Sequence, residues 1–227
     1  FLADCQLEDG TEVTAHCANP GSMMGLATPG MKIWLEPNDD PKRKLTYGWR
    51  LVDHENGHFT GVDTALPNRA IKAALMDRQI APFAGYTTVR PEVKYGENSR
   101  IDFLLTETGL PDAYVEVKSA TLSRTDGLVE FPDSVTKRGT KHLGELAQMA
   151  RDGHRAVLLY LVQRTDCGTF CVAADIDPAY AAAFADARAA GLETHVIGTH
   201  ISPQGVSVAG TIPLIDPPAL VLGNQAG

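Results

Sequence analysis

Two carboxylates and one lysine lie in neighbouring strand-like segments near the middle of the chain. Asp102 belongs to the first segment, Glu116 and Lys118 belong to the second, and turn-forming residues around Gly109 separate them. If Gly109 is the midpoint of a hairpin, Asp102 lies opposite Glu116, and the apolar residues of both strands share the other face. Carboxylates about 5.5 Å apart repel each other unless a cation lies between them. The pattern therefore predicts a site for a hard divalent cation, Mg²⁺ or Mn²⁺, bound by Asp102 and Glu116.

Metal-assisted phosphodiester hydrolysis is the chemistry that such a site would carry out. Lys118, beside the cation, would orient or deprotonate a water molecule, or stabilise charge that develops on a phosphate. Glu92 is either a further catalytic acid or an edge-strand charge, and Gln163 points either into the same cleft or into solvent. The alternative for the hairpin is a solvated strand face, on which a Glu-x-Lys pair is common.

A cationic helix is predicted after the hairpin, over residues 134–152. Its apolar side chains recur at helical spacing, and basic side chains gather on the opposite face, where they would bind nucleic-acid phosphates. In the hairpin register Arg100 lies opposite Lys118 and joins the same basic set. The DNA-binding residues predicted here are Arg100, Lys137, Arg138, Lys141 and His142. A solvated helix face is the alternative, because exposed helices commonly carry such residues.

The elements that position these residues divide the chain into two parts near residue 65. Short strands separated by turns predict a small antiparallel barrel in the first part, over residues 1–7, 12–17, 31–35, 45–52 and 58–62. The second part mixes helices with strands, which predicts an α/β (α+β) domain. Its predicted helices are residues 68–76, 134–152 and 177–190, and its predicted strands are 86–93, 99–106, 113–119, 156–163, 169–173, 195–201 and 206–209.

Composition excludes several classes of protein. The net charge of −8 argues against coating of nucleic acid by bulk attraction. It is distributed as −5 over residues 1–66, +1 over 67–174 and −4 over 175–227, so only the middle would tolerate a polyanion. No apolar stretch approaches the roughly 20 residues of a membrane helix. The four cysteines lack a metal or disulfide pattern, and we interpret them as buried free thiols in a reducing cytoplasm.

Several short sequences resemble those of a known protein family. They are Asn-Pro-Gly-Ser-Met at 19–23, Leu-Pro-Asn-Arg at 66–69, Glu-Val-Lys-Tyr-Gly at 92–96, Ser-Arg-Ile-Asp-Phe at 99–103, Tyr-Val-Glu-Val-Lys-Ser at 114–119 and Phe-Pro-Asp-Ser-Val-Thr at 131–136. Asp102 with Glu116-x-Lys118 and a following helix resembles the PD-(D/E)xK nuclease superfamily. Taken together, the short sequences are most similar to the sugar fermentation stimulation protein A family.

This resemblance implies an N-terminal OB-like β-barrel over residues 1–65, a PD-(D/E)xK nuclease-like mixed-sheet domain over 66–215 and a tail over 216–227. It also implies DNA as the partner and a link to the regulation of sugar (maltose) metabolism. Lys72 and Ala73 stand where the family often carries a glutamate, so a third acidic ligand would come from Glu92 or from a substrate phosphate. Two functions are therefore open: a Mg²⁺-dependent deoxyribonuclease, or a non-catalytic DNA-binding regulator.

An OB-like barrel commonly presents one strand face to nucleic acid. The candidate contacts in the first part are Lys42, Arg43, Lys44, Trp34, Tyr47 and Trp49. Small barrels also bury aromatic side chains, and burial is the favoured interpretation for Trp34. The oligomeric state is open, with a homodimer among the alternatives.

Overall fold

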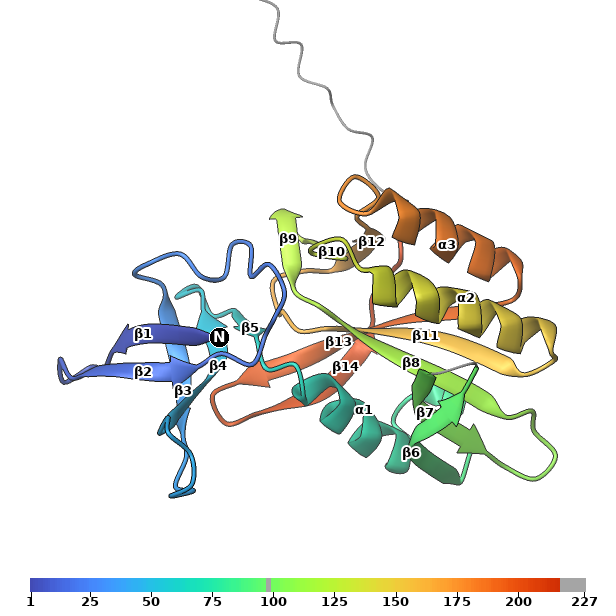
Figure 1. Ribbon diagram of the computed structural model, residues 1–227, viewed down its shortest axis with the longest axis horizontal. Coiled ribbons are helices and arrows are strands. Elements are labelled where there is room, and N and C mark those ends of the chain that lie inside the picture. The colour runs from blue at the N-terminus through green and yellow to red at the C-terminus, as the bar shows by residue number, and fades with distance from the viewer. Residues whose placement is uncertain (97–98, 217–227) are drawn as a thin grey trace, which may run out of the picture.

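The computed structural model describes residues 1–96 and 99–216, which form an N-terminal β domain and a larger α/β domain (Figure 1). Asp216 is the last described residue, so the rest of the predicted tail, 217–227, lies outside the described residues. No helix in the described ranges is long and apolar enough to cross a membrane. All four cysteines are free thiols, but the prediction that all are buried is wrong for Cys5 and Cys167, which are partly exposed.

The N-terminal domain contains the five predicted strands, each shifted by at most two residues at either end. They are β1 (Leu2–Gln6), β2 (Glu12–His16), β3 (Lys32–Pro37), β4 (Tyr47–Asp53) and β5 (Phe59–Gly61). Their order in the sheet is β1-β2-β4-β3, and β5 pairs with the C-terminal part of β4. The prediction of purely antiparallel pairing is wrong in one place, because β2 runs parallel to β4. The core of this domain is formed by Cys17, Leu26, Trp49, Val52 and Val62.

A six-stranded mixed sheet organises the second domain, in the order β14-β13-β11-β8-β7-β6. Its strands are β6 (Thr88–Tyr95), β7 (Ser99–Thr106), β8 (Ala113–Ala120), β11 (Arg155–Val162), β13 (Glu193–Ser202) and β14 (Gly205–Thr211). A smaller sheet of β9 (Leu122–Thr125), β10 (Leu128–Phe131) and β12 (Thr169–Val172) adjoins it. The sequence predicted β12 but not β9 or β10.

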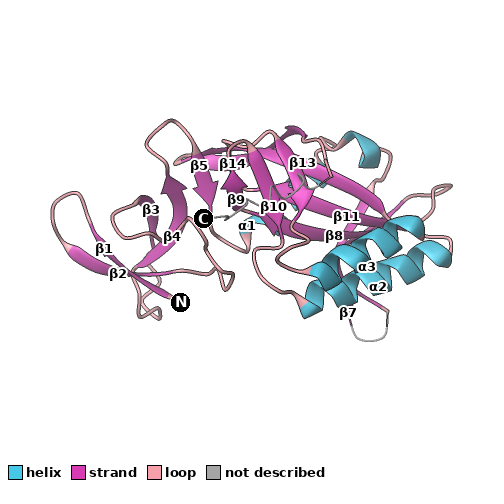
Figure 2. Cartoon of the chain, turned by 90° about the horizontal axis from the view of Figure 1, so that it is seen from above, coloured by secondary structure: helices cyan, strands magenta, loops and turns pink. Residues whose placement is uncertain are grey.

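Helices cover both faces of the large sheet. Helix α2 (Lys137–Arg151) and helix α3 (Pro178–Ala189) lie side by side on one face, and α1 (Leu66–Met76) lies on the other; a single 3₁₀ turn, η1 (Ala81–Phe83), follows α1 (Figure 2). Strand β11 explains this arrangement, because its even-numbered side chains pack under α2 and α3 and its odd-numbered ones pack on α1. A strand that is apolar on both faces must be buried on both.

The β7–β8 hairpin has the predicted register, but its two faces differ from the prediction. Phe103 pairs with Val115 and Leu105 with Ala113, as a turn centred on Gly109 requires. The pairing ends there, so the predicted pairs of Asp102 with Glu116 and of Arg100 with Lys118 do not form. The face that carries Glu116 was predicted to be polar and is in fact covered by α2, since Ala120 and Leu146 share one core cluster there. The charged residues of β8 therefore lie under a helix instead of in open solvent.

Candidate functional site

A cavity of about 440 Å³ opens between the β6–β7–β8 part of the large sheet and the N-terminal half of α2. We call it the carboxylate cavity. Its lining residues are Glu92, Ser99, Arg100, Asp102, Glu116, Arg138, Lys141 and His142. The structure thus brings together most of the residues that the sequence singled out, from two strands of the hairpin, an edge strand and a helix.

Glu116 is the most buried acid of the cavity, with 3% of its surface exposed. Its Oε1 accepts hydrogen bonds from Lys118 Nζ at 2.6 Å and from His142 Nδ1. Among the described residues its Oε2 is buried and has no hydrogen-bond partner. Burial alone would raise the pKa of the Glu116 carboxyl, but the bond from His142 and the charge of Lys118 outweigh burial and lower it. Glu116 is therefore a buried carboxylate with one free oxygen.

Asp102 lies where β7 and β8 separate. Its Oδ2 accepts a hydrogen bond from the backbone N–H of Val117 at 2.7 Å, and its Oδ1 accepts one from Asn68 Nδ2 at 2.7 Å. Burial and then the charge of Glu116 raise the pKa of the Asp102 carboxyl, although these two hydrogen bonds act against the increase. The two carboxylates line one cavity and repel each other, although they are not a directly paired position of the hairpin.

Asn68 lies at the site but was not predicted from the sequence. It belongs to the first turn of α1, on the far side of the sheet from α2, and it reaches Asp102 at the open end of the hairpin. The only signal for it was its place in the Leu-Pro-Asn-Arg sequence at 66–69.

His142 is placed differently from the prediction. It was expected on an exposed basic face, but only 5% of its surface is exposed, because α2 packs this position against β8. Arg138 Nε donates to His142 Nε2 at 3.4 Å, so His142 is an acceptor at Nε2 and donates from Nδ1 to Glu116. His142 is therefore a partner of the buried acid instead of a direct phosphate contact.

The other predicted cations remain at the surface. Arg100 and Arg138 are exposed at the rim of the cavity, and Lys141 lies 3.3 Å from Ser99 Oγ. Lys137 is exposed but does not line the cavity. The rim thus keeps three cationic side chains that can reach a ligand outside.

Glu92 and Gln163, the two undecided acid and amide candidates, have different positions. Glu92 is exposed, lines the carboxylate cavity and has a left-handed backbone with φ of 54°. Gln163 follows β11 and does not line the cavity; it is 1% exposed and its Nε2 donates to Ser119 Oγ at 2.6 Å. Its backbone oxygen accepts a bond from Gly61 N at 2.8 Å, so Gln163 joins the two domains.

The exposure of the two tryptophans in the first domain is the opposite of that predicted. Trp49, predicted as a DNA contact, is 6% exposed and its Nε1 donates to the backbone oxygen of Leu51 at 3.0 Å, so it belongs to the core. Trp34, expected to be buried, is 38% exposed. Trp49 therefore has no accessible face on which a base could stack, whereas Lys42, Arg43 and Lys44 are exposed as predicted.

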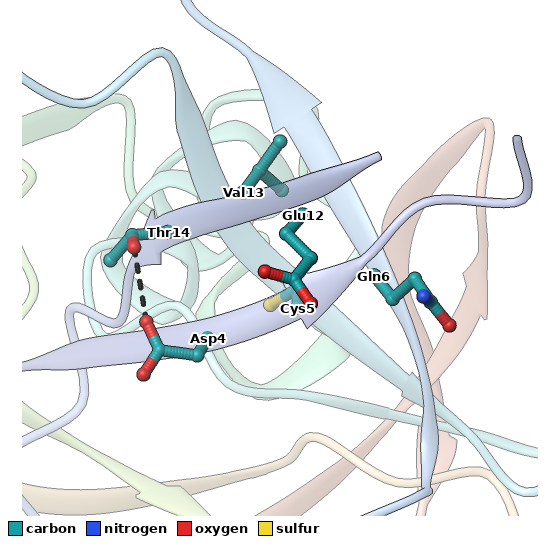
Figure 3. A pocket seen from close by; sticks show the side chains of 6 residues that line it. All are labelled: Asp4, Cys5, Gln6, Glu12, Val13 and Thr14. Atoms are coloured by element: carbon teal, nitrogen blue, oxygen red, sulfur yellow. Dashed lines mark hydrogen bonds between the residues drawn. The ribbon is translucent and has the colours of Figure 1, made fainter. Parts of the chain in front are cut away.

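A depression of about 660 Å³ on the β1–β2 hairpin is lined by acidic instead of basic side chains (Figure 3). Asp4 and Glu12 line it together with Cys5, Gln6, Val13 and Thr14, and the hydroxyl of Thr14 donates to Asp4 Oδ1 at 3.0 Å. No cationic side chain lines this depression. Its charge therefore does not suit a phosphate-bearing ligand.

Comparison with known proteins agrees with these features. The family model "Sugar fermentation stimulation protein RE domain" matches residues 65–205, and "SfsA N-terminal OB domain" matches residues 1–62. A sugar fermentation stimulation protein homolog of Roseobacter denitrificans is 72% identical, with 94% of this chain and 92% of that protein covered. Another from Ruegeria pomeroyi is 75% identical, with 92% and 91% covered.

One solved structure has the same fold over almost the whole chain. It is described as "The structure of Pyrococcus Furiosus SfsA in complex with Ca2+", with a TM-score of 0.84, 26% identity, and coverage of 95% of this chain and 90% of that chain. The N-terminal β domain is accordingly an OB domain, and the mixed α/β domain is of the SfsA type. The chain belongs to the sugar fermentation stimulation protein family.

Proposed function

We propose that this protein binds DNA and that its carboxylate cavity holds a divalent cation, Mg²⁺ or Mn²⁺, for phosphodiester hydrolysis. One observation carries the proposal: Asp102 and Glu116 line the same cavity, and Glu116 Oε2 is buried without a partner among the described residues. A buried, ionised oxygen without a donor is unfavourable, and a cation would satisfy it. The Pyrococcus furiosus protein in complex with Ca²⁺ supports a site for a hard cation in this family.

The residues present fit such a cation. Asp102 and Glu116 supply the carboxylate oxygens that Mg²⁺ and Mn²⁺ prefer. The described residues contain no cluster of three or more His, Cys, Asp or Glu side chains at metal-binding distances, so water and a substrate phosphate would complete the ligand set. When bound, the cation would polarise the phosphate and favour ionisation of the attacking water.

The side chains of the chain itself have separate tasks in this proposal. His142 donates to Glu116 and thereby holds its carboxylate in one orientation, as hydrogen-bond partners of metal ligands generally do. Lys118, fixed 2.6 Å from Glu116 Oε1, would direct its remaining N–H groups toward a phosphate oxygen or a water molecule. Arg100, Arg138 and Lys141 at the rim would bind phosphates of the DNA backbone.

A non-catalytic DNA-binding regulator of sugar (maltose) metabolism genes is the second candidate. It is favoured by the hydrogen bonds of Asp102, because Asn68 and Val117 already occupy both of its oxygens. Burial and the charge of Glu116 raise the pKa of Asp102, so its carboxyl ionises less readily than an ordinary aspartate. Such a protein would keep the basic rim for DNA without turning over its phosphodiester bonds.

Cleavage of supercoiled plasmid, followed on agarose gels in Mg²⁺, Mn²⁺ or EDTA, separates the two candidates. The nuclease proposal expects nicking that needs the metal and is abolished by Glu116→Gln, while Asp126→Asn, an exposed acid outside the cavity, is unaffected. DNA binding without nicking in any divalent ion, retained in Glu116→Gln, would support the regulator. If the protein neither binds nor nicks DNA, both candidate functions are contradicted.

A homodimer remains a prediction, and sedimentation velocity can test it.

A further inference from the structure

A second cavity, of about 460 Å³, lies between the OB domain and the first turn of α1. We call it the arginine cavity. Its lining includes Arg43 and Lys44 from the β3–β4 loop, Tyr47 and Arg50 from β4, and Arg69 from α1. Four cationic side chains face two anionic ones, Glu36 and Asp63, so the cavity has a surplus of positive charge in a domain that is otherwise acidic.

A buried carboxylate fixes two of these cations. Asp63 is 4% exposed, and its Oδ2 accepts hydrogen bonds from Arg50 Nη1 at 2.8 Å and from Arg69 Nη2 at 3.1 Å. Glu36 holds the other edge of the Arg50 guanidinium, at 2.6 and 2.8 Å. Arg50 thus uses three of its five N–H donors, whereas the Arg69 side chain is 65% exposed and uses one. Preorganised donors of this kind are suited to phosphate oxygens.

Arg43 and Lys44 have no side-chain hydrogen bond or ion pair within residues 1–96 and 99–216. Both line the same cavity as Arg69 and are exposed to solvent, so their charges can contact a ligand. The half-buried ring of Tyr47 lines the same cavity. An aromatic ring beside unpaired cations is the combination that binds a nucleotide, with the base on the ring and the phosphate on the cations.

We propose that the arginine cavity binds a phosphorylated nucleotide unit of single-stranded nucleic acid, with Arg43, Lys44 and Arg69 on its phosphate and Tyr47 against its base. This inference extends the proposed DNA binding to a second place in the molecule. It does not depend on metal binding or hydrolysis in the carboxylate cavity.

The test measures binding of a fluorescein-labelled single-stranded oligonucleotide by anisotropy in EDTA. The variant Arg43→Ala/Lys44→Ala/Arg69→Ala should bind at least about tenfold more weakly at low salt, and the slope of log K against log salt should fall by about 2, as expected for three lost contacts. Lys72→Ala/Arg78→Ala/Arg151→Ala removes the same charge from exposed positions outside the cavity and should bind within about twofold of wild type. Equal loss in both variants would overturn the proposal.

Further measurements identify the ligand and test whether the two cavities act independently. Tyr47→Leu should weaken binding about tenfold, and Tyr47→Phe, which keeps the ring, should restore it. Displacement of the oligonucleotide by a nucleoside monophosphate, but not by equal inorganic phosphate, supports a nucleotide site; equal displacement by inorganic phosphate indicates a simple anion site and overturns the proposal. The triple variant should keep the thermal stabilisation of wild type by Mn²⁺. Loss of that response would show that the substitutions disturb the carboxylate cavity and that the two cavities are not independent, which would overturn the proposal.

Discussion

Replacing the two acids of the carboxylate cavity by their amides should have unequal effects on the stability of the metal-free protein. Burial would raise the pKa of Glu116, but His142 and Lys118 lower it, so the fold favours the ionised form and Glu116→Gln removes a net attraction. Asp102 has the opposite balance, because burial and the charge of Glu116 raise its pKa. Asp102→Asn therefore relieves a repulsion while it removes the same formal charge.

The magnitudes follow from the partners of each group. Breaking a buried ion pair costs about 3–5 kcal/mol, and since the Lys118 side chain is 16% exposed we expect the lower end, about 3 kcal/mol, for Glu116→Gln. Asp102→Asn keeps one acceptor oxygen for Asn68 or Val117 and leaves the other donor unpaired. That loss costs about 1–3 kcal/mol, and the relieved repulsion offsets part of it, so we expect about 1 kcal/mol.

Urea unfolding in EDTA, followed by circular dichroism, measures both free energies of unfolding. If Asp102→Asn lowers the free energy of unfolding as much as Glu116→Gln does, or more, the opposite electrostatic balance of the two carboxyls is refuted. Addition of Mn²⁺ at about 100 times its Kd should stabilise wild type by about 2.7 kcal/mol, or about 5–11 °C in Tm. Both amide variants should lose this gain, whereas Asp126→Asn should keep it. A full Mn²⁺ response in Glu116→Gln would exclude Glu116 as a ligand.

Three other predictions test the fold around the site. A Cβ at Gly21 would clash with the Asp133 carboxylate, which would have to move and give up its hydrogen bond from the backbone N–H of Ser22; Gly21→Ala should therefore cost about 1 kcal/mol in urea, and an unchanged midpoint would contradict this contact. Tyr160→Phe leaves the buried Tyr180 hydroxyl without the partner it has at 2.6 Å, which should cost about 1–3 kcal/mol; a neutral effect would show that this bond adds nothing. A hydrogen bond from Arg155 lowers the pKa of Glu193, so wild type should be more stable than Glu193→Gln at pH 7, and the difference should shrink as the pH falls below about 4; a constant difference would refute the ionic origin.

The hairpin could be predicted from sequence because its information is local. The turn at Gly109, with φ of 86°, and the alternation of Val115, Glu116, Val117 and Lys118 indicate the register near the turn, and Phe103 opposite Val115 confirms it there. The exposure of Trp34 could also have been predicted from the sequence. Ile33 and Leu35 pack against the OB core, so the residue between them must face outward.

The partners of the carboxylates could not be predicted, because they come from distant parts of the chain. His142 is 26 residues from Glu116, and only the packing of α2 on β8 decides that this position faces the sheet. Asn68 is 34 residues from Asp102 and lies on a helix of the opposite face. Strands β9 and β10, four residues each, are too short to show a period, and β10 pairs in parallel with the distant β12.

Adjacent residues of α1 connect the two cavities. Asn68 donates to Asp102 in the large sheet, and Arg69 donates to Asp63, which follows the last strand of the OB domain. Successive helical side chains point about 100° apart, so one turn of α1 can contact both domains only if the helix keeps one rotation about its axis. Asp63 also accepts from the backbone N–H of Ala65 at 2.9 Å, directly before the helix begins. One buried acid thus fixes both the start of α1 and an arginine of the OB domain, and the next residue along from Arg69 toward that start, Asn68, holds Asp102.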